Sequence, residues 1–263
     1  MPELPEVETF KRYLDSTSLH QRITNVEVHD AYVLKRVSPR ELARRLKSHR
    51  FENSHRHGKH LFVHIGDALW LRVHFGMTGG LQYVKRDEEP PKNTRVIFRF
   101  ATNRRLAFHD QRKFGEIELI KDVDDFLQTR GIGPDALEIG LSQFKTIVGN
   151  CRGAVKAILL NQQVIAGIGN LYADEILFRA RVHPATQAAT LSNMDLRRLF
   201  CATRCVLGKA IALKTDFNRL PKSWLMTRRG KRGRCPRCCR ALKSQMIGGR
   251  TSWFCAYCQK RAA

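Results

Sequence analysis

The sequence HLFVHIGDALWLRVHFG, residues 60–76, is the stretch that decides the fold class. Apolar and polar residues alternate along it on both sides of Gly66, which is typical of half-buried strands between turn signals. The same pattern recurs in five further segments: residues 23–37, 81–84, 94–100, 104–110 and 115–120. One helix, at about residues 39–47, interrupts them, and DEEPPKN at 87–93 indicates a surface loop. Many short strands in succession predict an N-terminal β-sandwich or barrel.

The chain on either side of this region has a helical pattern. Residues 1–20 indicate a short helix. After GIGPDAL (131–137), apolar residues recur at helical spacing in four segments: residues 141–149, 152–160, 171–180 and 193–213. The turn-like QQVIAGIGN (162–170) separates the second from the third. We therefore predict an α+β chain of several domains, with flanking helices on the sandwich and a basic linker at about residues 214–234.

The composition indicates a folded chain with a polyanionic partner. The chain has 263 residues, 43% of them hydrophobic, which is enough for a sizeable core. It has no run of about eighteen apolar residues, and its acidic start is unlike a secretory signal, so we expect a cytoplasmic chain. The formal net charge is +23. An excess of this size favours nucleic acid, with an anionic membrane surface as the second choice.

The positive charge is concentrated at the C-terminus. Residues 217–263 contain thirteen Lys or Arg and no Asp or Glu. This tail is therefore the strongest candidate for phosphate contact, and a solvated basic tail is the alternative. Because no segment has the pattern of a basic amphipathic membrane helix, we expect a nucleic-acid partner and no membrane.

Five of the eight cysteines lie close together near the C-terminus, in CPRCC (Cys235, Cys238, Cys239) and CAYC (Cys255, Cys258). Two CxxC knuckles separated by sixteen residues indicate a tetrahedral zinc site, with a redox pair as the weaker alternative. The spacing selects Cys235, Cys238, Cys255 and Cys258 and leaves Cys239 as a spare. One Zn²⁺ held by four thiolates has no open position for water, so its role is structural. The remaining cysteines, expected as buried thiols in helical sequence, are Cys151, Cys201 and Cys205.

The first six residues, MPELPE, are chemically unusual. Removal of Met1 would expose Pro2 as a secondary amine, part of which is neutral at neutral pH. Such an amine can attack an acetal carbon and form an iminium ion, as a lysine does in Schiff-base catalysis. Glu3 beside it can protonate a leaving or ring oxygen. Proline and acids are also common at helix starts, and the six residues alone favour that structural explanation.

The order of several motifs resembles the formamidopyrimidine-DNA glycosylase and endonuclease VIII family over nearly the whole chain. Those motifs are MPELPEVET at the N-terminus, GKHL (58–61), HFGMTG (74–79), HDQRKFGE (109–116), GIGPDAL, VIAGIGNLYADEILF (164–178) and the two-CxxC ribbon. The PELPEVE start is closer to the formamidopyrimidine branch. The resemblance implies a monomeric enzyme acting on damaged double-stranded DNA, with a sandwich at residues 1–130, a helix–two-turn–helix domain at 131–220 and a basic linker with a zinc ribbon at 221–263.

The resemblance also implies the chemistry. Pro2 is then the nucleophile at the anomeric carbon of the sugar, and Glu3 is the acid and proton shuttle. The iminium is an electron sink that supports β- and δ-elimination, so one residue serves both base excision and strand cleavage. Lys59 would contact the phosphate next to the lesion and support catalysis, although an exposed strand-end lysine is the alternative. Glu6 and Glu175 would support the site.

A second group of residues is implied to bind DNA: His74, Met77, Arg112, Phe114, Lys156, Asn170 and Arg250. Met77, Arg112 and Phe114 would fill the hole that a flipped base leaves and would bond to its orphaned partner. Gln111 stands where the family motif has proline. The structural alternatives are a core histidine at His74, core packing for Met77 and Phe114, and an ordinary helix cap at Asn170.

The resemblance is weakest between Phe217 and Cys235. The formamidopyrimidine branch has a longer, glycine-containing loop here that covers a flipped oxidised purine, whereas this chain has a compact basic stretch with Pro221, Trp224 and Met226. We therefore expect intact catalysis but weak excision of 8-oxoguanine. A non-catalytic zinc-ribbon protein that binds damaged DNA is the alternative function, and it would not need an exposed secondary amine.

Overall fold

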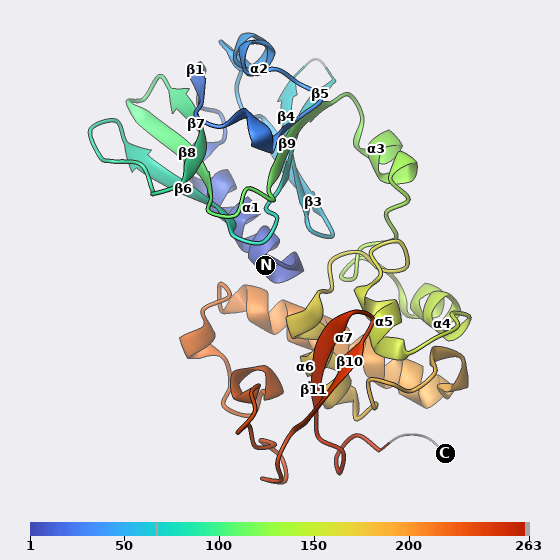
Figure 1. Ribbon diagram of the computed structural model, residues 1–263. Helices are drawn as coiled ribbons and strands as arrows, with labels where there is room; N and C mark the ends of the chain where they lie inside the picture. Colours follow the sequence, from blue (N-terminus) through green and yellow to red (C-terminus); the bar gives the residue numbers. More distant parts are fainter. Residues whose placement is uncertain (67, 261–263) are drawn as a thin grey trace. The chain divides into compact units, whose positions relative to one another are not determined.

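The computed structural model describes residues 1–66 and 68–260, which form two compact units (Figure 1). Unit 1 comprises Met1–Pro2 and Glu6–Arg130. Unit 2 comprises Glu3–Pro5 and the chain from Gly131 onward. The first helix, α1 (Leu4–Ser18), thus begins in unit 2 and continues in unit 1.

Unit 1 is the predicted β-sandwich. One sheet has the order β1-β7-β8-β6 and the other has the order β2-β9-β5-β4-β3, with β2 and β9 parallel and every other pair antiparallel. The strands of the first sheet are β1 (Ile23–Val28), β7 (Thr94–Phe100), β8 (Arg104–Asp110) and β6 (Gly79–Lys85). Those of the second are β2 (Leu34–Lys35), β9 (Glu116–Ile120), β5 (Leu69–His74), β4 (His60–Gly66) and β3 (Asn53–His57). The apolar residues of the alternating pattern form one buried core, as Val73 and Phe98 illustrate.

The helices of unit 1 partly follow the sequence prediction. α2 (Pro39–Leu46) begins at a Ser38 cap with proline in its first turn, as expected. A 3-10 turn, η1 (Ala31–Val33), divides the segment 23–37 that the alternation predicts as strand, and the Asp30 carboxylate caps this turn. A further helix, α3 (Val123–Thr129), was not predicted, because its seven residues carry too short an apolar stripe.

Unit 2 is helical, and its helices lie close to the predicted segments. They are α4 (Leu141–Gly149), α5 (Val155–Leu160), α6 (Asn170–Ala180) and α7 (Asn193–Ala212), with the 3-10 turn η2 (Ala188–Thr190) between the last two. α5 begins three residues later than predicted. α7 begins at a reciprocal capping box between Ser192 and Asp195. Buried residues such as Ile176 and Leu199 form one core between these helices.

The segment at 214–234, predicted as a basic linker, packs against the rest of unit 2. It contains the 3-10 turns η3 (Phe217–Arg219) and η4 (Leu225–Arg228). Trp224 and Met226 are buried against the helical core, and Leu225 packs in a small cluster with Cys235 and Cys255. Its few apolar residues therefore anchor the segment, while cations such as Arg228 and Arg232 are exposed.

The ribbon follows as a hairpin of β10 (Lys243–Ile247) and β11 (Arg250–Phe254). The expectation of buried thiols elsewhere was wrong for Cys201 and Cys205, which are exposed, and Cys151 is half-buried. The two exposed cysteines lie four residues apart on α7. None of the described helices is long and apolar enough to cross a membrane.

Candidate functional site

Glu3 is held by the first turn of α6. Its carboxylate accepts backbone N–H bonds from Gly169 (2.7 Å), Leu171 (2.9 Å) and Tyr172 (3.3 Å), and the side chain is only 3% exposed. A Cβ on Gly169 would lie 2.2 Å from the Glu3 carboxyl carbon, so only glycine allows this approach. The positive end of the helix and its free N–H groups favour a carboxylate here. The motif AGIGN therefore forms a cradle for Glu3.

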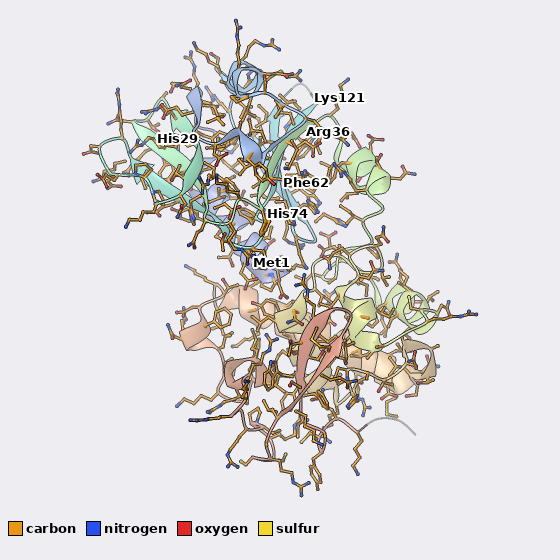
Figure 2. The ribbon with its side chains drawn as sticks, in the orientation of Figure 1. Met1, His29, Arg36, Phe62, His74 and Lys121 are labelled. Atoms are coloured by element: carbon orange, nitrogen blue, oxygen red, sulfur yellow. The ribbon has the colours of Figure 1, made fainter. Side chains whose placement is uncertain are left out.

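Pro2 precedes this anchor directly. It is half-buried, and Met1 before it is 52% exposed (Figure 2). The N-terminus is thus accessible to the removal of one residue. The backbone N–H of Leu4 donates to the Gly167 carbonyl at 3.0 Å, so the chain is fixed immediately after Glu3.

Lys59 and His74 both belong to the second sheet of unit 1. Lys59 lies in the turn between β3 and β4 and is 8% exposed. His74 ends β5 and is half-buried (Figure 2). Burial, and next the Arg72 guanidinium, lower the pKa of His74 to about 4. Its Nδ1 accepts the Gly76 N–H at 3.2 Å, so Nε2 carries the proton and is a neutral donor.

Arg72 is a buried cation beside His60 and His74 that the sequence did not single out. It is 1% exposed, and its guanidinium donates to Glu116 at 2.7 Å and to Glu118 at 3.0 Å. Its Nη1 lies 3.2 Å from Nδ1 of His60. The sequence has only a weak signal for this ion pair: an arginine between apolar residues in one strand, and two acids two residues apart in a later strand. The pair can be recognised only once the two strands are known to be neighbours.

Met77, Arg112 and Phe114 lie on two neighbouring turns of unit 1. Phe114 is 52% exposed, and the Arg112 guanidinium lies 5.0 Å from the centre of its ring. Gly76 has φ +57, and a Cβ there would lie 2.3 Å from the Phe114 carbonyl carbon, so glycine lets the two turns meet. The structure thus brings Phe114 and Arg112 together on an exposed surface, with Met77 half-buried on the turn beside them.

Asp110 fixes these two turns and was also missed. Its side chain is fully buried and accepts the Gly115 N–H at 2.7 Å, the Arg112 N–H at 3.2 Å and the Thr78 hydroxyl. The turn therefore holds its shape with Gln111 in place of proline. The sequence signal that could have identified it is an aspartate at the start of a turn, because such a carboxylate commonly accepts the backbone N–H two residues further along the chain.

Asn170 is the first residue of α6, and Gly169 rather than Asn170 is the cap. Its side-chain Oδ1 is buried and has no hydrogen-bond partner among the described residues. The oxygen and nitrogen of a side-chain amide are assigned from their hydrogen bonds, so the position of Oδ1 could equally hold the NH₂ group. In either case this atom can still form a hydrogen bond to a ligand. The cap alternative for Asn170 is therefore wrong.

Lys156 lies in the interior and not on the surface. Its exposed fraction is 0%, and its Nζ donates to Asp174 at 2.6 Å and to the Thr251 carbonyl at 3.3 Å. Asp174 also accepts the Trp253 N–H at 3.1 Å and pairs with Arg229 at 3.1 Å. Burial raises the pKa of Asp174 and lowers that of Lys156, and the partner's charge opposes each shift. Through these two bonds the ammonium joins α5 to α6 and β11, and the expected DNA contact of Lys156 stays a prediction.

Glu175, next to Asp174 on α6, forms a hydrogen bond to the segment that contains η4. Its carboxylate accepts the Met226 N–H at 3.0 Å and pairs with Arg179 at 3.0 Å. Burial raises the pKa of Glu175, and the Met226 N–H and Arg179 oppose that shift. Glu175 therefore anchors the segment that contains η4.

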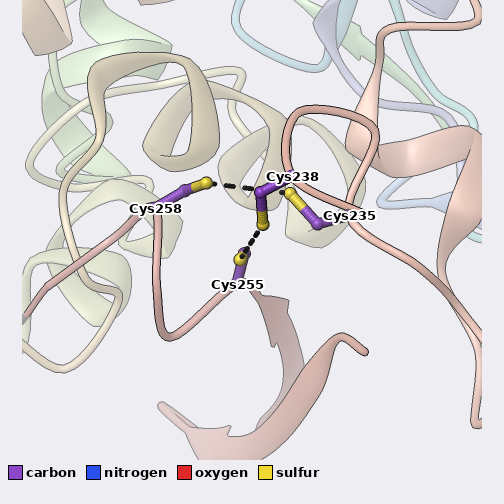
Figure 3. A group of neighbouring side chains, drawn as sticks. All are labelled: Cys235, Cys238, Cys255 and Cys258. Carbon is purple, nitrogen blue, oxygen red and sulfur yellow. Dashed lines mark hydrogen bonds between the residues drawn. The ribbon is translucent and has the colours of Figure 1, made fainter. Parts of the chain in front are cut away.

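The four cysteines selected by spacing form one cluster (Figure 3). Their sulfur atoms all lie within 4.8 Å of one another, with Sγ–Sγ distances of 3.5 Å for Cys238–Cys255 and 3.9 Å for Cys235–Cys258. Cys239 is exposed and lies outside this group. Four thiols at this spacing can hold one metal ion. Arg250 is exposed at the start of β11, at the other end of the hairpin.

Comparison with known proteins agrees with this architecture. The model of the formamidopyrimidine-DNA glycosylase N-terminal domain matches residues 1–117, and that of the H2TH domain of the same enzyme matches residues 131–220. The formamidopyrimidine-DNA glycosylase of Pelotomaculum thermopropionicum is 34% identical over 99% of both chains. That of Bacillus subtilis is 33% identical over 99% of this chain and all of its own.

Solved structures give the same result. The formamidopyrimidine-DNA glycosylase of Lactococcus lactis, bound non-covalently to DNA with an AP site, superposes with a TM-score of 0.90 at 29% identity, covering 98% of this chain and 100% of that one. A MutM complex with DNA containing carbocyclic 8-oxo-G has a TM-score of 0.89 at 30% identity, with 99% and 100% covered. The fold is therefore that of a base-excision-repair DNA glycosylase. The chain belongs to the formamidopyrimidine-DNA glycosylase family, which confirms the resemblance seen in its motifs.

Proposed function

We propose that this glycosylase removes oxidised or ring-opened bases from double-stranded DNA through Pro2 and then cuts the strand at the abasic site. The observation that carries the proposal is the anchoring of Glu3 by three backbone N–H groups directly after Pro2. A buried carboxylate fixed beside a prospective secondary amine is the arrangement that proton transfer requires. We place this activity in the cytoplasm, on nucleoid DNA, with the enzyme as a monomer.

The reaction begins once Met1 has been removed. The Pro2 nitrogen attacks C1′ of the damaged nucleotide, the bond from C1′ to the base breaks, and the departing base takes a proton from water. The proton that the Pro2 nitrogen loses passes to the Glu3 carboxylate, which delivers it to the ring oxygen O4′ as the sugar ring opens and the iminium forms. The resulting iminium makes the C2′ proton acidic, so that the 3′ phosphate leaves by β-elimination and the 5′ phosphate leaves by δ-elimination. Lys59 supports this chemistry at the neighbouring phosphate, and Glu6 supports the network around it.

The DNA contacts come from both units. Phe114 and Met77 fill the space of the extruded base, and Arg112 bonds to the orphaned partner. His74 donates from its neutral Nε2, Asn170 uses its unfilled hydrogen-bonding position at the start of α6, and Arg250 binds phosphate from the ribbon. The structural relatives bound to DNA with an AP site, Fapy-dG or carbocyclic 8-oxo-G support this class of substrate.

The four-cysteine cluster is a structural zinc site in this proposal. Cys235, Cys238, Cys255 and Cys258 fit Zn²⁺ in number, donor type and proximity. When bound, the ion cross-links the two knuckles and takes no part in the reaction. Its loss would release the hairpin that carries Arg250.

The lesion preference follows from the compact stretch at residues 217–234. Trp224 and Met226 are buried, and Glu175 holds the Met226 N–H, so this segment has little freedom to close over a base. Discrimination of 8-oxoguanine from guanine needs polar groups around the edge of the purine. We therefore propose faster excision of ring-opened purines or oxidised pyrimidines, and efficient cleavage at abasic sites, which requires no base recognition.

Borohydride trapping on a panel of lesion duplexes tests this function. The wild-type enzyme should form a covalent adduct at Pro2, and Pro2→Gly or an added N-terminal residue should remove it. Glu3→Gln should retain binding to damaged DNA but lose base excision, because an amide cannot transfer the proton, while its remaining oxygen still accepts backbone N–H groups at the start of α6. An adduct that maps to Lys59 would overturn the role of Pro2. The absence of any adduct, together with tight binding, would favour a non-catalytic damage-binding protein. If 8-oxoguanine opposite cytosine is the fastest substrate, the argument from the compact segment is wrong.

A further inference from the structure

A cavity lined by cations lies beside the first cysteine knuckle of the ribbon. Its volume is about 440 Å³. The cationic residues that line it are Lys222, Arg228, Arg232 and Arg234, and the remaining lining residues are Gly233, Cys235, Pro236 and Cys239. None of these described lining residues is acidic. We refer to this site as the knuckle cavity.

The backbone builds the cavity through a tight turn at Gly233. A Cβ at this position would lie 2.1 Å from the Arg228 carbonyl oxygen, so no other residue fits. The Gly233 N–H bonds to the Gly230 carbonyl at 2.9 Å, and its own carbonyl accepts the Leu242 N–H at 2.9 Å. This reversal brings Arg228 and Arg234 around one space although five residues separate them in the sequence.

The cations of the knuckle cavity are not neutralised within the chain. All four are exposed, and none forms an ion pair in the part of the chain that the structure describes. Arg229, in contrast, is 19% exposed and pairs with Asp174 at 3.1 Å. Like charges held around one space repel each other, and an anion placed between them relieves that repulsion. Within RRGKRGR (228–234), Arg229 is thus used for packing, whereas Arg228, Arg232 and Arg234 line the cavity without an acidic partner in the described chain.

The knuckle cavity is remote from Arg250. The hairpin register pairs Ile247 with Arg250 at the tip and Lys243 with Phe254 at the knuckle end. Five residues of extended chain from Arg250 to Cys255 span about 16 Å. Neighbouring phosphates along one strand of duplex DNA are separated by about 3.4 Å of helix axis, so this distance corresponds to about five nucleotides. One phosphate therefore cannot contact both Arg250 and the knuckle cavity.

We propose that the knuckle cavity binds a backbone phosphate of the DNA flank, about five nucleotides from the phosphate that Arg250 holds. This inference rests on the DNA binding by Arg250 in the proposed function. The ribbon then has two phosphate contacts, one at each end. The enzyme therefore contacts a longer stretch of duplex than the lesion site alone requires. The arginine side chains provide planar donor groups suited to phosphate oxygens.

The test compares two charge-matched double variants of the full-length, metal-loaded enzyme. Arg232→Gln/Arg234→Gln removes two cavity cations, and Lys231→Gln/Lys243→Gln removes two exposed cations of the same ribbon that do not line the cavity. The ligand is duplex DNA with an uncleavable abasic-site analogue, with its flanks trimmed on each side separately. Affinity is measured against salt concentration. Metal content and the urea midpoint check folding, and Lys222→Gln/Arg228→Gln replaces the first pair if that pair does not fold.

On the long duplex, the cavity variant should lower the slope of log affinity against log salt by about 0.9 for each phosphate that it no longer neutralises. The slope of the control variant should stay near that of the wild type. Trimming one flank to fewer than about five base pairs should make the cavity variant and the wild type equal. Trimming the other flank should leave the difference between the cavity variant and the wild type unchanged.

Three results would overturn the inference. Equal slope losses in the cavity and control variants would show only a general charge effect. An equal loss on short and long duplexes would place the cavity at the lesion site. Binding of inorganic pyrophosphate that depends on the cavity arginines, without any dependence on flank length, would indicate a small-anion site. If the wild type binds no abasic duplex at all, the proposed function itself fails, which is a separate outcome.

Discussion

In each unit a buried aspartate holds residues that we propose to bind DNA, and the two aspartates are satisfied in different ways. Asp110 in unit 1 accepts two backbone N–H groups and the Thr78 hydroxyl, all of them neutral donors. Asp174 in unit 2 accepts one backbone N–H and pairs with the cations of Lys156 and Arg229. The first arrangement joins two neighbouring turns of unit 1. The second joins α5, α6, the segment after η4 and β11.

This difference predicts how much stability each unit loses when its buried aspartate is replaced. A buried carboxylate bonded to neutral donors leaves polar groups unsatisfied when it is removed, whereas loss of Asp174 leaves a buried ammonium without its counter-charge. Unit 2 also has the four-cysteine cluster at the far end of the same hairpin. The exposed residues of unit 1 thus depend on local turn geometry, and Arg250 depends on connections between distant segments.

The largest expected effect is the loss of metal from unit 2. Chelation, or Cys255→Ser, should release one zinc and unfold the ribbon, because metal binding in such sites contributes about 10–16 kcal/mol. Amide NMR signals from residues 235–258 should lose their dispersion, and those of the sandwich should remain. Cys239→Ser is the control and should keep the metal. Metal loss on changing Cys239 but not Cys238 would show that the other thiol is the ligand.

Replacement of Asp174 comes next. Asp174→Asn should lower the free energy of unfolding by about 3–5 kcal/mol, because Lys156 remains buried and unpaired. Affinity for damaged duplex should fall as well, since β11 is no longer held at Trp253. The double variant Asp174→Asn/Lys156→Met should recover part of the stability, as measured by urea titration. No recovery would mean that the ion pair is not the source of the loss.

Asp110→Asn should have a smaller effect, about 1–3 kcal/mol, because one acceptor oxygen remains while an amide group meets a donor. The turn that carries Arg112 and Phe114 should loosen, which amide hydrogen exchange at Gly115 would report. Binding to intact duplex should change less than binding to a lesion duplex. If Asp110→Asn costs as much as Asp174→Asn, the distinction between the two aspartates is not valid.

The smallest effect is a pH dependence in unit 1. The folded protein holds the pKa of His74 near 4, against 6.5 for an ordinary histidine, so the unfolded chain binds a proton that the folded chain does not. The free energy of unfolding should therefore fall as the pH falls from 7 to 5, by at most about 2 kcal/mol from this residue. His74→Gln should flatten that part of the curve. An unchanged curve would assign the dependence to His60, whose pKa burial also lowers.

Much of the site could be predicted because its signals are local. The knuckle spacing selected the four clustered cysteines, and the glycines of AGIGN anticipated the turn that now cradles Glu3. The predictions that failed concern burial. Cys201 and Cys205 resembled core thiols but are exposed. The burial of Lys156 beside Asp174 had no signal in the sequence.

The sequence by itself determined the sandwich, the helical segments and the knuckles, because alternation, helical spacing and CxxC are properties of neighbouring residues and act on the chain locally. Only the tertiary structure decided which charges are paired. Asp174 meets Lys156, Arg229 and Trp253 because four distant segments pack together, and Arg232 remains unpaired because no carboxylate reaches its side of the ribbon in the described chain. Burial and charge pairing depend on which segments become neighbours, and packing of the whole chain sets that.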